Sequence, residues 1–204
     1  MRWIGIFVIT LLFLGCQQGP QPPAATVEAT QPVPASEGKS IQLTPTTSQI
    51  IAVGRKLTGK HEIRFPLKSG QLTLAPDNCP VGGKIVLDMS KLEVLDLKGE
   101  WKSKLEEHLR SEDFFLTSTY PEAVFEITGC EKSASDTVYL AGNLTLRGVT
   151  KNIRFPAVVR LTQDTLYATA SFTINRQEWG VAYKGKADDL IQDEVAIQLN
   201  LRAP

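Results

Sequence analysis

The sequence predicts an all-β protein, a closed antiparallel up-and-down barrel of about eight strands with short helices between strands around residues 90–115. Three observations indicate this fold. Apolar and polar residues alternate with period two from residue 123 almost to the C-terminus, short polar turns join the alternating segments, and the stretch before them is polar with leucines at helical spacing. A meander this long avoids exposed edge strands by closing on itself.

Four segments of the C-terminal half carry the clearest strand pattern. Each places its apolar residues on one face and its polar residues on the other, as a strand with one buried face does. The segments are 138–146, 153–161, 166–174 and 195–201. We expect turns between them at Arg147–Lys151 and Gln163–Asp164.

The N-terminal half alternates less regularly. Strands are predicted at 50–53, 63–67, 72–74, 85–89 and 123–127, with turns at Ser69–Gly70 and Pro76–Asn78. Leu105 and Leu109 stand four residues apart, which places them on one face of a helix. The interior of an eight-stranded barrel is either filled by side chains or holds one slender ligand, and alternation alone leaves both open.

Residues 1–15 have the pattern of a secretory signal peptide, because Arg2 precedes an apolar run that is too short to span a bilayer comfortably. The run ends at Phe13-Leu14-Gly15-Cys16, which resembles a bacterial lipobox and implies that Cys16 carries palmitate-type acyl chains as a membrane anchor. Gln17, rather than Asp, follows Cys16, so by resemblance to Gram-negative sorting signals we expect the periplasmic face of the outer membrane. An ordinary secretory signal with an incidental cysteine is the alternative.

Residues 16–43 comprise this cysteine and a segment rich in Gln, Pro, Ala and Thr. Such a segment cannot bury enough surface to offset its ordering entropy, so we predict a disordered tether that spans roughly 25–30 Å. Residues 44–204 are of single-domain size and form the predicted barrel.

Cys79 and Cys130 remain once Cys16 is assigned to the anchor. An even pair of cysteines in an oxidising compartment favours a disulfide. The loop before the strand at 84–89 and the loop after the strand at 124–128 lie at the same end of the barrel if these strands are antiparallel neighbours. We therefore predict a Cys79–Cys130 disulfide.

Composition and motifs argue against several classes of function. The 22 basic and 22 acidic residues balance without a basic cluster, so nucleic acid is not an expected partner. His61 and His108 are the only histidines and no metal-ligand spacing is present, so we expect no metal and no cofactor apart from a bound lipid. A general base at His108, near Asp113, is conceivable, but a polar turn that closes one barrel end explains these residues better, and no catalytic residue is assigned. The oligomeric state stays open, a homodimer included.

Several segments resemble the YceI-like family, in the same order and at similar spacing. They are His108–Phe115, Tyr120-Pro121, Gly142–Lys151 and Ile174–Val181, and the resemblance runs from about residue 46 to 202. It implies a lipocalin-like antiparallel barrel, typically exported, with an elongated apolar tunnel that takes up polyisoprenoid chains or comparable long-chain amphiphiles. Glu178-Trp179 departs from the Asp-Phe that is commoner in the family.

The inward phase of the strands supplies the candidate tunnel lining. Small residues in that phase favour a hollow interior. Aromatic residues such as Trp101, Trp179 and Tyr183 suit either the mouth of a tunnel or the core. Arg176 either meets a ligand headgroup or, as we favour, pairs with Asp113 or Glu178. The candidate lining and rim residues are Phe125, Ile127, Leu140, Gly142, Leu144, Phe155, Ala157, Ala168, Ala170, Phe172, Arg176 and Trp179.

The expected function is non-enzymatic binding, storage or transport of a long-chain apolar ligand at the cell envelope, with a polyisoprenoid, quinone-like or fatty amphiphile inside the barrel. The expected partners are therefore this lipid and, through the anchor, the membrane. Two alternatives stay open. One is an envelope scaffold or stress protein with a filled core that acts through protein contacts. The other is an enzyme that acts on a lipid through His108.

Overall fold

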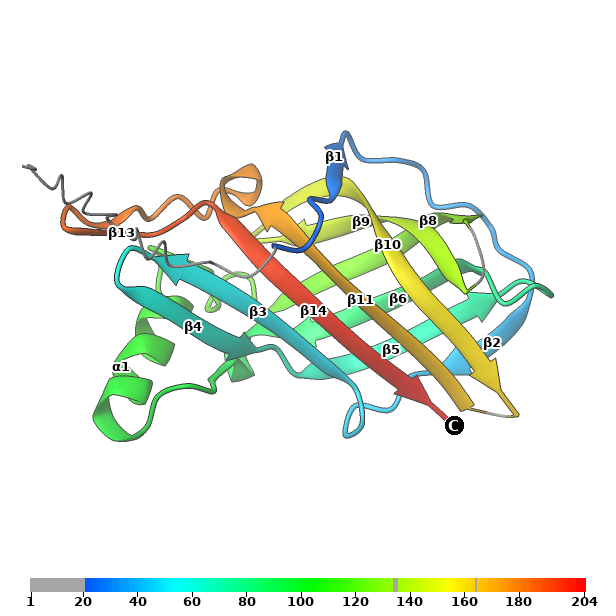
Figure 1. Cartoon of the computed structure of the whole chain (residues 1–204), viewed down its shortest axis with the longest axis horizontal. Helices are drawn as coiled ribbons and strands as arrows, with labels where there is room; N and C mark the ends of the chain where they lie inside the picture. The colour runs from blue at the N-terminus through cyan, green and yellow to red at the C-terminus, as the bar shows by residue number, and fades with distance from the viewer. Residues whose placement is uncertain (1–20, 134–135, 164) are drawn as a thin grey trace, which may run out of the picture.

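One curled antiparallel sheet makes up most of the molecule (Figure 1). The computed structural model describes residues 21–133, 136–163 and 165–204, so the predicted signal peptide and Cys16 lie outside the described residues. The strands of the sheet are β1 (Thr26–Glu28), β2 (Lys39–Gln42), β3 (Gln49–Lys56), β4 (Gly59–Arg64), β5 (Leu67–Leu74), β6 (Pro80–Asp88), β7 (Glu93–Val94), β8 (Glu122–Lys132), β9 (Thr137–Leu146), β10 (Val149–Thr162), β11 (Thr165–Asn175) and β14 (Glu194–Ala203).

Three further kinds of element complete the described fold. The α-helix α1 (Gly99–Arg110) and the 3-10 turn η1 (Met89–Lys91) fall in the region where short helices were predicted. A second 3-10 turn, η2 (Arg176–Trp179), follows β11, and β12 (Gly185–Lys186) pairs with β13 (Asp189–Leu190) in a small hairpin. None of the helices in the described ranges is long and apolar enough to cross a bilayer.

The C-terminal meander follows the alternation in the sequence. β8, β9, β10, β11 and β14 pair in chain order, all antiparallel. The turn between β9 and β10 is tighter than predicted: Val149 pairs with Leu146, so only Arg147 and Gly148 form the loop. Both have positive φ, 50° and 74°, the backbone conformation that matches the twist of a two-residue hairpin.

The N-terminal half departs from the predicted pattern at Ser69–Gly70. These residues are not a turn but part of β5, with a register shift between Leu67 and Ser69. Gly70 is required for packing, since a Cβ there would lie 2.6 Å from Cδ1 of Leu43. The chain passes from β4 into β5 at Phe65–Pro66, where the Phe65 amide donates to Ile50 of β3 and the Pro66 carbonyl accepts from Asp88 of β6.

The ladder of strands is open, so the prediction of a closed eight-stranded barrel is not confirmed. Pairing runs in the order β2-β5-β6-β8-β9-β10-β11-β14-β3-β4-β7, and among the described residues its two ends, β2 and β7, are not paired with each other. β4 has β3 and β7 as its partners, and β5, which follows it in the chain, has β2 and β6. The sheet curls into a half-barrel whose concave side holds the core.

The segment that was predicted as a disordered tether is ordered against the sheet over much of its length. Ala24 bridges Thr173, β1 pairs with β10 at Asn152–Arg154, and β2 pairs with β5. We call residues 23–42 the strap. In Figure 1 it runs from β1 across the outside of the sheet to β2. The prediction of disorder is therefore wrong for these residues. Their composition offers little apolar surface to bury, but backbone hydrogen bonds to strands of the sheet hold them in place.

The strap occupies a place where two neighbouring strands separate. β10 and β11 pair from Ala157↔Ala170 to Thr162↔Thr165, and beyond Ala157 the strap takes over as a partner of β10. Its Ala25 and Val27 pack against the core. Two buried amides on the outer face of the sheet hold it further along: Asn143 exchanges hydrogen bonds with the backbone of Gln31 (3.0 and 2.6 Å), and Asn152 donates to Asn143 (3.0 Å).

The predicted disulfide is present. Cys79 and Cys130 are bonded with their Cα atoms 6.0 Å apart, which ties the start of β6 to β8. A cross-link over about 50 residues stabilises a fold by about 4 kcal/mol through the entropy of the unfolded chain.

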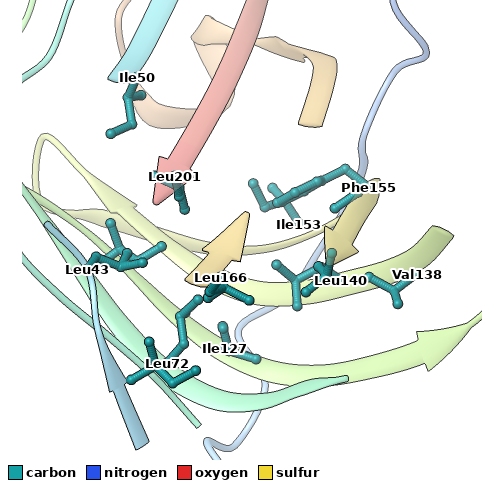
Figure 2. Close-up of a cluster of buried hydrophobic side chains, with 14 of the residues drawn as sticks. Leu43, Ile50, Leu72, Ile127, Val138, Leu140, Ile153, Phe155, Leu166 and Leu201 are labelled. Atoms are coloured by element: carbon teal, nitrogen blue, oxygen red, sulfur yellow. The ribbon is translucent and has the colours of Figure 1, made fainter. Parts of the chain in front are cut away.

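The buried apolar residues fall into two clusters, one at each end of the half-barrel. The larger cluster fills the end near the disulfide, and Figure 2 shows its Leu72, Ile127, Leu140 and Leu166 converging from four different strands. The smaller cluster joins α1 to β4, β7 and η1 at the opposite end. The larger cluster also contributes residues to the cavity described below, among them Ile50, Phe155 and Leu201.

An apolar cavity and its mouth

A cavity of about 230 Å³ lies on the concave side of the sheet, between the two core clusters. Its lining extends along β3 from Ile50 to Lys56, six residue steps or roughly 20 Å of strand. Apolar side chains dominate the walls, and Arg55, Lys56, His61 and Arg176 are the polar side chains that reach it within the described residues. Such a space suits a slender apolar molecule whose polar end lies near the charged residues.

Five of the twelve residues predicted for the lining or rim face this cavity: Phe125, Leu144, Phe155, Phe172 and Arg176. Three of these are aromatic and form one cluster. The rings of Phe155 and Phe172 stack with centroids 4.0 Å apart, and Phe125 lies 5.8 Å from Phe155. These rings form one wall of the cavity.

The other predicted lining residues lie elsewhere. Ile127, Leu140 and Ala157 are buried in the filled end, and Ala168 and Ala170 pack against it half-buried. Their side chains do point inward, as the alternation predicted, but they are not among the residues that line the cavity.

Gly142 and Trp179 have structural roles. A Cβ on Gly142 would lie 2.3 Å from Cζ of Phe125, so the glycine makes room for a ring that lines the cavity. Trp179 is fully buried, and its indole N–H donates to the carbonyl of Leu144 (3.0 Å). Trp179 thus belongs to the core and not to a rim.

Arg176 reaches the cavity but pairs with a residue that the sequence did not suggest. It is buried, and its guanidinium donates to Asp193 (2.9 Å) and to the backbone carbonyls of Gln192 and Val181. Asp113 and Glu178, the expected partners, contact His108 and Lys151 instead. A structural role for Arg176 was expected, and its partner is the start of the segment that leads into β14.

His108 stands outside the cavity. Its Nε2 lies 3.2 Å from Asp113, and its ring packs edge-on against Phe114 and Tyr183, with centroids 5.0 and 4.8 Å away. Phe114 and Phe115, which follow it, do line the cavity. This segment closes part of one end of the half-barrel, as the sequence suggested.

The charged lining residues gather toward the turn between β3 and β4, and we call this end of the cavity its mouth. His61 holds Asp96 by a 2.8 Å hydrogen bond, and Lys56 pairs with Asp189 at 2.6 Å. Burial alone would raise the pKa of Asp96, but hydrogen bonds from the Glu62 amide and from His61 outweigh it and hold the pKa below its usual value. Sequence reasoning missed His61 as a lining residue, although it shares the inward phase of Ile63 and Phe65.

No group of three or more His, Cys, Asp or Glu in the described residues is arranged to hold a metal ion.

Comparison with known protein families identifies the family of this chain. The sequence model of the YceI-like domain matches residues 42–203. The chain belongs to the YceI-like family.

Curated relatives agree with this assignment. A UPF0312 protein of Azotobacter vinelandii is 34% identical over 79 residues, which cover 35% of this chain and 41% of the relative. A UPF0312 protein of Pseudomonas putida is 25% identical over 127 residues, 58% of this chain and 63% of the relative. Protein YceI of Escherichia coli is 44% identical over 52 residues, 26% of this chain and 27% of the relative. The matches thus span less than two thirds of each relative.

Two solved structures share the YceI-like fold with this chain. Burkholderia cenocepacia BcnA superposes with a TM-score of 0.68 at 21% identity, covering 79% of this chain and 99% of that one. A polyisoprenoid binding domain from Saccharophagus degradans, implicated in plant cell wall breakdown, gives a TM-score of 0.62 at 16% identity, covering 82% and 98%. At these identities the likeness establishes the fold.

Proposed function

We propose that this YceI-like domain binds one long-chain apolar ligand, a polyisoprenoid, quinone-like or fatty amphiphile, and stores or carries it without changing it chemically. The observation that carries the proposal is the cavity of about 230 Å³, with apolar walls and charged residues only toward one end. The polyisoprenoid binding of the Saccharophagus degradans domain, which has the same fold, adds support. A filled-core scaffold needs no such cavity, and an enzyme using His108 would need that residue inside it.

We further propose that the protein works at the cell envelope, held through a lipid on Cys16 at the periplasmic face of the outer membrane. The Cys79–Cys130 disulfide supports an oxidising compartment, because such bonds persist outside the reducing cytosol. The acyl chains would then supply the membrane affinity.

Ligand extraction tests the binding proposal most directly. We expect mass spectrometry of an organic extract from the purified protein to find one long-chain lipid per chain. We also expect added quinones or fatty amides to bind more tightly as the chain lengthens, by up to about 0.8 kcal/mol per methylene, until the cavity is full. Finding neither a co-purified lipid nor binding of these probes would rule the proposal out.

A cavity-filling variant makes the test specific. Ala52 is buried and lines the cavity, so Ala52→Phe places a ring in the ligand's space. Gln49 lies on the same strand but is exposed, which makes Gln49→Phe the matched control. We expect Ala52→Phe to lose the bound lipid while Gln49→Phe keeps it.

A further inference from the structure

The mouth of the cavity is surrounded by exposed apolar side chains. Leu57 is 69% exposed and Leu190 47%, and the Leu57 amide donates to the Leu190 carbonyl (3.2 Å). Their chain neighbours Lys56 and Ile191 line the cavity. Two large aliphatic side chains therefore stand in solvent directly beside the opening, where nothing within the described chain covers them.

α1 adds an aromatic residue to the same edge. Trp101 is 73% exposed and lies four residues before Leu105, on the same helix face, and Leu105 lines the cavity. Leu95, 40% exposed, donates its amide to Glu62 of β4. Figure 1 shows α1, the β3–β4 turn and β13 together at one end of the molecule. We call Leu57, Leu95, Trp101 and Leu190 the mouth rim.

Basic residues stand next to the mouth rim. Lys98 precedes α1, and Lys184 and Lys186 flank the start of the β12–β13 hairpin. None of the three has a carboxylate of the described residues within ion-pairing distance. Exposed Leu and Trp side chains surrounded by lysines are the combination that binds an anionic lipid surface, because the apolar groups enter the interface and the ammonium groups meet the headgroups.

The strap limits how far the anchor can lie from this end. Pro23 accepts a hydrogen bond from Thr173, and Thr173 stands across the sheet from Ala196 and Val53. From that row the mouth at Lys56 is three residues away, roughly 10 Å, whereas the other end of β11 at Thr165 is eight residues away, roughly 27 Å. Pro23 is seven residue steps from Cys16, and such a segment spans at most about 25 Å. Cys16 can therefore reach a bilayer at the mouth with length to spare, whereas the other end of β11 lies at the limit of its reach.

We propose that the mouth rim docks on the anionic bilayer that holds the Cys16 lipid, so that the cavity opens onto the acyl-chain region. This inference rests on the proposed anchor and ligand binding. A long apolar ligand would then pass between bilayer and cavity without crossing water, and the strap sets the orientation that makes this passage direct.

The test uses the mature lipidated protein in vesicles of phosphatidylethanolamine and phosphatidylglycerol, with and without brominated acyl chains. Mature protein that begins at Cys16 has two tryptophans, exposed Trp101 and buried Trp179, so Trp101→Phe gives the background from Trp179. We expect the brominated lipid to quench Trp101 and vesicles to shield it several-fold from aqueous acrylamide. Trp101 that stays fully open to acrylamide, without bromine quenching, would overturn the proposal.

Two further variants separate docking from anchoring. Leu57→Ser combined with Leu190→Ser leaves the anchor in place, and we expect it to float with the vesicles while losing most of the bromine quenching. Tyr167→Ser removes an aromatic ring near the opposite end of β11, where Tyr167 is 39% exposed. We expect this variant to keep the bromine quenching. Equal quenching in all three proteins would reject the mouth rim as the docking surface.

The same samples show whether a negative result contradicts the anchor, the docking surface or the ligand binding. Protein that does not float with vesicles lacks the anchor and overturns this inference and the proposed location together. Lipid extraction from that protein still reports ligand binding by itself. A protein that docks but yields no long-chain ligand would defeat the proposed function and leave the docking surface standing.

Discussion

Gly142 lies directly against the ring of Phe125, so closely that a Cβ at position 142 would come within 2.3 Å of Cζ. The two residues sit on neighbouring strands, and the ring of Phe125 forms part of the cavity wall. The shape of the ligand space therefore depends on a glycine that does not itself face it.

Gly142→Ala should push the Phe125 ring into the cavity. We expect a loss of stability of about 1–3 kcal/mol, typical of overpacking, together with a reduced capacity for long-chain ligand. Urea denaturation and lipid extraction measure the two effects. Gly129→Ala is the matched control, because a Cβ there has nothing within 4 Å; equal losses in both variants would contradict the explanation.

Removing the disulfide should weaken the fold without altering the cavity. Replacing Cys79 and Cys130 together by Ala is expected to cost about 4 kcal/mol, since the loop between them is no longer closed in the unfolded chain. Chemical denaturation of the double variant measures this loss, and dithiothreitol should have a similar effect on the wild type. A wild-type protein whose free thiols are unchanged by reductant would refute the bond.

Asn143→Ala should loosen the strap. Asn143 is buried and exchanges two hydrogen bonds with Gln31, so its removal leaves the partner groups unpaired at a cost of about 1–3 kcal/mol. Hydrogen exchange followed by mass spectrometry should show faster exchange at residues 24–31 and unchanged exchange at β2. Thr30→Ala removes an exposed side-chain contact from the same stretch and should have little effect. Slow exchange throughout residues 24–31 in Asn143→Ala would show that the amide does not hold the strap.

Stability at the cavity mouth should depend on pH through Asp96. Its pKa is lowered in the folded state from the ordinary value of 3.8 by its hydrogen bonds to the Glu62 amide and His61, which outweigh its burial. The carboxylate thus stabilises the fold above that ordinary value, and the contribution is lost as pH falls through the lower, folded-state pKa. We expect the difference in unfolding free energy between wild type and Asp96→Asn to shrink from pH 6 to pH 3. A difference that is constant with pH would argue against this assignment.

The alternation of apolar residues was sufficient to predict the strands of the C-terminal half, because one buried face imposes its period on each of them. It could not place the cavity. Ala157, Ala168 and Phe172 share the inward phase, yet only Phe172 lines the cavity, since alternation reports which side of the sheet a residue faces and not whether other side chains fill the space before it. The YceI-like resemblance supplied the family, and the structure supplied the position of the cavity.

Contacts between distant parts of the chain account for the other differences. The strap has a composition typical of disorder, and its order comes from partners on β10 and β5 that lie far away in the sequence. Asp193 is 17 residues from Arg176, and nothing in the local sequence marks it as the partner of a buried guanidinium. The ladder likewise ends at β7, a two-residue strand too short for any periodicity to reveal.

The strap also extends the folding unit beyond the residues that the YceI-like family model covers. The YceI-like domain matches from residue 42, but a chain shortened to that point would lose β1 and nearly all of β2. Asn143 and Asn152 would then face water on the outside of the sheet, and β10 would lose its partner at Asn152–Arg154. Such a shortened chain presents an unpaired strand edge, which is a template for association with other chains, so aggregation on truncation would follow from the lost strap even where the cavity is intact.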